Sequence, residues 1–294
     1  MNIIFIWILI FLFIFHPGFA HDGAEAGAKL FVHALLPYLL PYIILTQWLL
    51  KMPNSSNKSP LWTRFVKAFI LGSFGGFPVG AVTVTEMVKN SELTHRQGAF
   101  LLAACHAPGP MFIIGFVGNE LLGSVTTGWK LLLSIHIANL LFFFITLLFL
   151  KAKIEPNSTS FPLADKTKGS PLLEAIKDST TIITLIATTV IFFSALGTVL
   201  SNIFSSAFNI DTGITTTITL AIFEMTIGVQ SATDHFSELT IFPFLIAAIL
   251  SLNGLSIHMQ VAVIAKSSNI SMLPYIGGRI WSFLLVPIIF YILY

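Results

Sequence analysis

The chain has 294 residues, of which 55% are hydrophobic and only 10% are charged, with a formal net charge of +2. Soluble domains usually carry about 25% charged residues, so this composition excludes a large soluble domain and indicates a polytopic membrane protein. The small net charge gives no indication of nucleic-acid binding, and the single cysteine, Cys105, excludes an intrachain disulfide and a cysteine-rich metal cluster.

The first apolar run, residues 2–15, is shorter than the ~20 residues that a spanning helix usually needs. Small residues at Gly18 and Ala20 precede a cleavage position at His21 that would suit a signal peptide. However, no Lys or Arg precedes the run, as a secretory signal normally requires. We therefore expect an uncleaved hydrophobic helix over residues 1–28, with a signal-like segment as the alternative.

Further apolar segments follow along the chain. They cover residues 30–50, 65–88, 99–122, 129–150, 179–208, 213–230, 239–265 and 272–294. Two polar connections, 51–64 and 151–178, are rich in Lys and Arg. Because basic residues mark the cytoplasmic ends of membrane spans, both connections are expected inside the cell.

This placement has a consequence for segment 65–88. Three apolar segments lie between two cytoplasmic connections, yet an odd number of crossings would put the connections on opposite sides. The conflict disappears if 65–88 is a re-entrant hairpin with its tip at residues 75–80. The predicted organisation is then a first repeat over 29–150, a cytoplasmic linker over 151–178 and a second repeat over 179–294.

A short sequence match relates the two halves. Residues 91–94 recur as residues 237–240, an offset of 237 − 91 = 146, and the same offset places Pro78 on Glu224. The second hairpin, 213–238, would enter the membrane from the opposite side to the first. We therefore predict an all-α polytopic membrane protein with two inverted-topology repeats, each with a re-entrant helical hairpin and a broken transmembrane helix.

The interruptions of the apolar segments predict a substrate site, because lipid cannot hydrogen-bond a broken backbone. The candidate substrate-binding residues there are Gly75, Gly76, Pro78, Gly80, Pro108, Gly109, Pro110, Glu224, Gly228, Gln230, Asn253, Gly254, Ser256, His258 and Gln260. Half-helix N-termini would present N–H groups to an anionic substrate. The side chains of Ser256, His258 and Gln260 would line one polar groove if the backbone is extended there, whereas a helix would spread them over two faces.

Two charged residues fall within apolar segments. Glu224 is expected to face a polar pathway or the bundle interior, because a carboxylate at membrane depth is costly; the alternative is a structural anchor for the hairpin tip. Arg279 is also a candidate substrate-binding residue, because a guanidinium binds carboxylates bidentately. It could instead extend towards the cytoplasmic end of its segment, or pair with Glu224.

Several segments together carry a family resemblance. They are Leu35–Tyr42, Gly75–Ala81, Pro110–Gly115, Phe223–Gly228, Gly254–Gln260 and Pro274–Arg279. Over nearly all of residues 30–290 the chain resembles the sporulation integral membrane proteins of the YlbJ type, within the nucleoside-recognition (Gate) domain group related to nucleoside transporters. The resemblance implies transport of a small metabolite, with dipicolinate as the associated substrate, across the membrane that surrounds the forespore. Cys105-His106 departs from the Asn/Ser-like turn expected there, which leaves the substrate open.

The sequence therefore predicts a transporter or facilitator of a small anionic metabolite, with the lipid bilayer as its other partner. No cofactor, metal or nucleic acid is expected. The alternatives are a nucleoside transporter-like protein and a non-transporting assembly factor. An enzyme is not favoured, because residues 254–258 lack the final Gly of a hydrolase elbow and no zinc-protease or phosphate-loop motif occurs. The coupling ion, the direction of transport and the oligomeric state, including a homo-oligomer, stay open.

Overall fold

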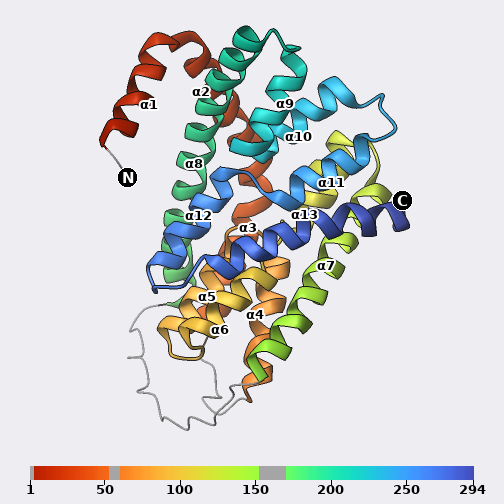
Figure 1. The fold of residues 1–294 in the computed structure, drawn as a ribbon. Helices are drawn as coiled ribbons and strands as arrows, with labels where there is room; N and C mark the ends of the chain where they lie inside the picture. Colours follow the sequence, from red (N-terminus) through yellow and green to blue (C-terminus); the bar gives the residue numbers. More distant parts are fainter. Residues whose placement is uncertain (1–2, 53–59, 152–169) are drawn as a thin grey trace. The chain divides into compact units, whose positions relative to one another are not determined.

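The computed structural model describes residues 3–52, 60–151 and 170–294, so the centres of both polar connections, with Lys58, Lys153, Lys166 and Lys168, lie outside the described residues. All regular secondary structure in these three ranges is helical (Figure 1). By length and composition, five helical stretches within them can cross a membrane: Pro17–Lys51, Val125–Leu150, Pro171–Phe208, Phe242–Lys266 and Leu273–Leu293. The predicted all-α, multi-pass class is confirmed at this level.

The chain forms two compact units. Unit 1 comprises Met1–Pro37 and Thr184–Met259, and unit 2 comprises Tyr38–Ile183 and Gln260–Tyr294. Each unit therefore combines segments that are distant in the sequence.

Unit 1 is built around a helical hairpin and a long helix. Its elements are α1 (Ile3–Phe15), α2 (Pro17–Leu30), the π-helix η1 (Phe31–Leu35), most of α8 (Pro171–Phe208), α9 (Thr212–Phe223), α10 (Met225–Phe236), α11 (Phe242–Leu252) and the start of α12 (Leu255–Lys266). Helix α9 begins where the Asp211 side chain accepts a hydrogen bond from the Ile214 N–H at 3.1 Å. Helices α2 and α8 pack closely because a Cβ at Gly23 would lie only 2.6 Å from Thr198 Oγ1.

Unit 2 contains the other hairpin and the C-terminal helix. Its elements are most of α3 (Leu36–Lys51), α4 (Leu61–Gly75), α5 (Val79–Lys89), α6 (His95–Ala104), the π-helix η2 (Phe112–Leu121), α7 (Val125–Lys151), the first part of α8, the end of α12 and α13 (Leu273–Leu293). A capping box starts α6: the Thr94 side chain accepts from the Gln97 N–H, and the Gln97 side chain accepts from the Thr94 N–H.

The hairpins α4–α5 and α9–α10 each consist of two helices lying side by side (Figure 1). In α4–α5 the turn occupies residues 76–78, between the end of α4 at Gly75 and the start of α5 at Val79. Gly76 has φ +74° and ψ −172°, a conformation that is essentially restricted to glycine. In α9–α10 a single non-helical residue, Glu224, separates the two helices.

Three boundaries differ from the sequence prediction. The candidate residues Glu224, Gly228 and Gln230 do not share one interruption: only Glu224 is non-helical, because its carboxylate caps α10 at once. The interruption near Asn253 is also short, since α12 begins at Leu255. Helix α8 begins at Pro171, inside the predicted linker 151–178, where the Asp178 carboxylate lies 2.6 Å from Lys51 Nζ.

The π-helix η2 was not predicted. Its wide turn is stabilised at the C-terminal end, where the Leu122 N–H donates to the Val117 carbonyl five residues earlier. Tyr38 of α3 packs on it: a Cβ at Gly115 would lie 2.7 Å from the Tyr38 ring, and the Tyr38 hydroxyl donates to Glu120 Oε1 at 2.6 Å. Tyr38 therefore contacts η2 at two points.

Candidate functional site

In unit 2 the hairpin turn lies directly against the broken helix. The interruption between α6 and η2 spans Cys105 to Gly109. A Cβ at Gly76 would lie 2.6 Å from the backbone nitrogen of Gly109, so the two backbones are in contact. The sequence-predicted residues Gly75, Gly76, Pro78, Gly80, Pro108 and Gly109 are all buried here, and Pro110 is half-buried. This arrangement is called the unit 2 crossing.

Cys105 lies at the centre of the unit 2 crossing. It is the C-cap residue, directly after the last residue of α6, and its thiol is fully buried. Two glycines allow α4 and α5 to approach it: a Cβ at Gly72 would lie 2.8 Å from Cys105 Cβ, and one at Gly80 would lie 3.1 Å from the Cys105 carbonyl oxygen. Cys105 packs as a small apolar group, and its environment is a sensitive indicator of whether the crossing is intact.

Aromatic side chains fill the space beside this interruption. The His106 ring lies 4.5 Å from the Phe77 ring and 5.0 Å, edge-on, from the Tyr275 ring, measured between centroids. All three side chains are buried. Tyr275 was not among the predicted site residues, because in the sequence it is one aromatic residue of an apolar segment, within the family-like stretch Pro274–Arg279.

Arg279 is buried, with 3% of its surface exposed. Its Nη2 donates to the Ala103 carbonyl oxygen at 3.1 Å, and its guanidinium carbon lies 5.7 Å from the centre of the Tyr275 ring. The alternative in which Arg279 extends to the membrane surface is therefore wrong. The physical reason is that Ala103 lies in the last turn of α6, where a cation is favourable to the helix dipole and a carbonyl needs a donor.

A second side-chain hydrogen bond stabilises the unit 2 crossing. The side-chain amide of Asn139, on α7, donates to the His106 carbonyl oxygen at 3.2 Å. The Ser282 hydroxyl donates in turn to Asn139 Oδ1 at 3.4 Å. Asn139 was also missed from the sequence, although a buried asparagine in the apolar segment 129–150 was a usable signal, since such amides usually bind across helices.

In unit 1 the hairpin tip also lies against a broken helix. The α9–α10 junction at Glu224 contacts the Asn253-Gly254 interruption: a Cβ at Gly254 would lie 2.8 Å from the Met225 backbone nitrogen and 3.2 Å from Glu224 Cα. Asn253 and Gly254 are both buried, and Asn253 has a positive φ of 62°. This arrangement is called the unit 1 crossing.

Glu224 supplies the charge of the unit 1 crossing. Its side chain is 1% exposed. Oε2 accepts from the Ile227 N–H at 2.9 Å, and Oε1 accepts from the hydroxyls of Thr226 at 3.3 Å and Ser256 at 3.4 Å. The carboxylate thus caps α10 and also faces two hydroxyl groups. A structural role at the hairpin tip and a role in a polar site are therefore compatible for Glu224.

The remaining predicted residues are placed on helices. Gly228 lies within α10, where a Cβ would be 2.5 Å from the Ala221 backbone, so its role in unit 1 is close packing of the hairpin. Gln230 is exposed. His258 is half-buried, and Ser256 and Gln260, four residues apart on α12, are buried. Of the two alternatives for these three residues, the structure has the helical one, because α12 begins at Leu255.

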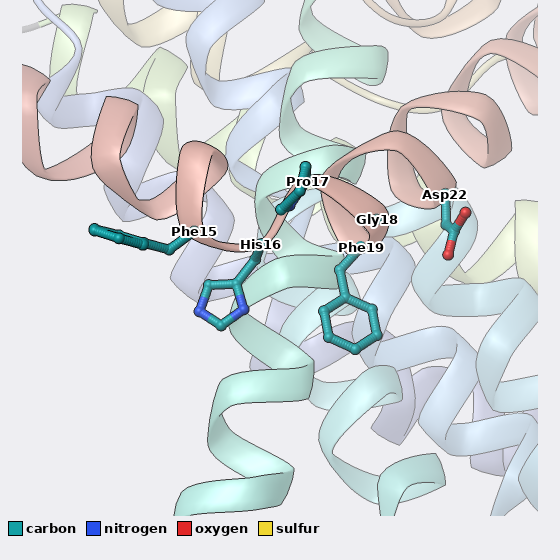
Figure 2. Close-up of a pocket in the computed structure, with 6 residues that line it drawn as sticks. All are labelled: Phe15, His16, Pro17, Gly18, Phe19 and Asp22. Carbon is teal, nitrogen blue, oxygen red and sulfur yellow. The ribbon is translucent and has the colours of Figure 1, made fainter.

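A separate open hollow lies at the elbow between α1 and α2 in unit 1 (Figure 2). Its lining residues are Phe15, His16, Pro17, Gly18, Phe19 and Asp22. None of them is buried, and none belongs to either crossing. Elsewhere in the described ranges, no three His, Cys, Asp or Glu side chains are grouped in a way that could hold a metal ion.

Comparison with known proteins gives one relevant similarity. The chain is 22% identical over 307 aligned positions to the sporulation integral membrane protein YlbJ of Bacillus subtilis (strain 168), an alignment that covers 90% of this chain and 75% of that protein. No protein-family model matches the chain, and no solved structure matches it. The similarity and the five apolar helices make the chain a multi-pass protein of the cell membrane.

Proposed function

We propose that the protein is a membrane transporter or facilitator of a small polar metabolite. The observation that carries this proposal is the recurrence of one arrangement in both units: a helical hairpin whose turn is in backbone contact with an interrupted helix. Interrupted helices at membrane depth are tolerated where protein or a water-filled cavity satisfies the backbone, and paired interruptions are typical of secondary transporters.

The proposal includes two inverted-topology repeats with re-entrant hairpins. Its support is that the sequence offset of 146 residues relates equivalent positions of the two crossings. The offset takes Pro78, at the turn of α4–α5, to 78 + 146 = 224, the junction of α9–α10, and takes Pro108 to 108 + 146 = 254, the unit 1 interruption.

The two crossings differ in charge, and this difference bears on the substrate. In the unit 2 crossing, Pro78 precedes α5 and has no side-chain group that could cap the helix, so an anion at this end would meet the positive end of the helix dipole with no carboxylate beside it. A small carboxylate is therefore our first substrate class. We extend the sporulation role in the relative's name to this protein on the same basis, with dipicolinate as the specific candidate.

A nucleoside-like substrate is the second candidate, and Glu224 favours it. A buried carboxylate repels an anion but accepts hydrogen bonds from hydroxyl groups. In unit 1 it already faces the hydroxyls of Thr226 and Ser256. A ligand with sugar-like hydroxyls could replace those donors without leaving the carboxylate unsatisfied.

Uptake by the purified protein in liposomes tests the proposal. Radiolabelled dipicolinate and a nucleoside are supplied separately, and each is used as a competitor of the other. Saturable uptake of either supports transport and identifies the class. If neither compound is taken up and no product forms, the proposal is contradicted and an assembly role is favoured. Product formation would instead reveal an enzyme.

Matched variants link that assay to the crossings. Glu224→Gln removes the charge of the unit 1 crossing at constant size and should reduce nucleoside uptake more than dipicolinate uptake. Gly277→Ala is the control, because nothing lies within 4 Å of the added Cβ. Equal uptake by both variants would show that Glu224 is not part of the substrate site.

A further inference from the structure

The interruption in unit 2 creates a specific problem for backbone hydrogen bonding. In an uninterrupted helix, the carbonyl of Ala104 would accept from the N–H of residue 108, and that of His106 from residue 110. Both positions are proline and have no N–H. The carbonyl of Ala103 loses its helical partner as well, because the helix ends at Ala104. Buried carbonyl groups without donors are strongly unfavourable, above all where no water is present.

Two side chains from other helices supply donors at two of these carbonyls, those of Ala103 and His106. Arg279 Nη2, on α13, donates to the Ala103 oxygen at 3.1 Å, and the Asn139 amide, on α7, donates to the His106 oxygen at 3.2 Å. The two bonds lie on either side of Cys105. Together they replace helical hydrogen bonds that the interruption removes.

Helix α13 presents its donors on one buried stripe. Tyr275, Arg279 and Ser282 are spaced four and three residues apart and are all buried, so they share one face of the helix. Ser282 donates to Asn139 Oδ1 at 3.4 Å, which turns the amide nitrogen of Asn139 towards His106. A Cβ at Gly278 would lie 3.0 Å from Ala103 Cβ, so α13 also contacts the end of α6 directly.

We propose that Arg279 and Asn139 are positioning residues that hold the interruption of α6 open by binding its carbonyl groups. This inference deepens the proposed function, and its transport readout rests on that function. It changes the role of Arg279: the guanidinium acts on the protein backbone, with its donor directed at Ala103, and a substrate carboxylate is not its main partner.

The arrangement also explains how one interruption can favour an anion. A broken helix exposes carbonyl groups at one end and N–H groups at the other. Arg279 and Asn139 occupy carbonyl groups next to Cys105. Two carbonyl oxygens that would repel an anion are thereby occupied by donors from the protein.

Cys105 provides a direct readout, because it is the sole cysteine of the chain and is fully buried between the two bonds. Its rate of alkylation by N-ethylmaleimide is measured on detergent-purified protein, well below the melting temperature. Arg279→Gln and Asn139→Asp should each raise this rate about fivefold or more, because losing the donor to a buried carbonyl makes local opening easier. Arg279→Lys, which keeps a cationic donor, should restore part of the protection.

The control is Trp281→Phe. Trp281 Nε1 donates to the Ala138 carbonyl at 3.0 Å, so this variant removes a hydrogen bond between the same two helices, α13 and α7, beside Asn139 but away from the interruption. Its alkylation rate should stay at the wild-type level. If Arg279→Gln does not yield folded protein, Ser282→Ala, which removes only the bond to Asn139, replaces it and should raise the rate by a smaller factor.

Uptake of the substrate by the same variants in liposomes separates positioning from direct binding. A positioning role predicts faster Cys105 alkylation together with a lower maximal rate of uptake. Unchanged alkylation with a raised KM for a carboxylate substrate would overturn the inference and make Arg279 a substrate ligand. If wild-type vesicles take up nothing, the proposed function fails, while the alkylation rates still decide whether these residues hold the interruption: equal rates in wild type, Arg279→Gln and Asn139→Asp would refute it.

Discussion

Replacing Gly76 with alanine should disrupt the unit 2 crossing more than any other single methyl group added there. The backbone at Gly76 has φ +74° and ψ −172°, and forcing a non-glycine residue into such a region costs about 1–3 kcal/mol. The new Cβ would also lie 2.6 Å from the backbone nitrogen of Gly109. Relieving that overlap requires a backbone shift that costs roughly another 1–3 kcal/mol.

The expected loss for Gly76→Ala is therefore about 2–6 kcal/mol, the sum of these two costs. For a chain of this size it corresponds to a decrease of the melting temperature by about 4–12 °C. A thiol-reactive fluorescent dye can follow melting in detergent, because Cys105 is buried in the folded protein and becomes reactive on unfolding.

Gly277→Ala is the matched control, since it adds the same methyl group inside helix α13 with nothing within 4 Å. Alanine is the better helix former, so this variant should melt at or slightly above the wild-type temperature. The reasoning about the unit 2 crossing is refuted if Gly76→Ala melts within 2 °C of wild type, a margin of roughly 1 kcal/mol, or if both variants are destabilised equally.

Three further variants test other contacts. Gly254→Ala places a Cβ 2.8 Å from the Met225 nitrogen and should lower stability by about 1–3 kcal/mol, measured by the same melting assay; wild-type stability would contradict the close approach. Glu224→Gln should lose less than about 1 kcal/mol, because the amide oxygen can still cap α10, whereas Glu224→Ala should lose about 1–2 kcal/mol; equal melting temperatures would show that Glu224 is not a cap. Tyr38→Phe removes the hydroxyl bonded to Glu120 and should cost about 0.5–1.5 kcal/mol. That cost should vanish in a Glu120→Ala background, as a double-mutant cycle measures.

The positions of the interruptions could be predicted from local chemistry. Glycine and proline at Gly75–Gly80 and at Pro108–Pro110 disfavour a continuous helix regardless of what packs around them, and the structure has non-helical residues at both places. The all-α, multi-pass class followed equally directly from composition.

The lengths of the interruptions depended on tertiary contacts and could not be predicted. Whether α10 begins at Met225 or after Gln230 is decided by the Glu224 carboxylate, which accepts from the Ile227 N–H and is also bonded by the Ser256 hydroxyl, 32 residues away in the chain. The burial of Arg279 likewise depends on the Ala103 carbonyl, which is 279 − 103 = 176 positions away in the chain. Sequence patterns report periodicity and local breaks, but they do not show which distant carbonyl needs a donor.

The π-helical pitch of η2 has a consequence for the evolution and engineering of this segment. Gly115 and Glu120, the two points that Tyr38 contacts, are 120 − 115 = 5 residues apart. At about 100° per residue, an α-helix would rotate them roughly 140° apart, whereas a helix bonded from i to i+5 turns less per residue and brings them nearer to one face. Forcing the unshortened segment into an ordinary α-helix would therefore move the two contacts apart, whereas deleting one residue would leave them four apart, roughly 40° around an α-helix. The π-helical turn is thus what allows Tyr38 to contact two residues five positions apart, and a segment with one residue fewer should keep both contacts as an ordinary α-helix.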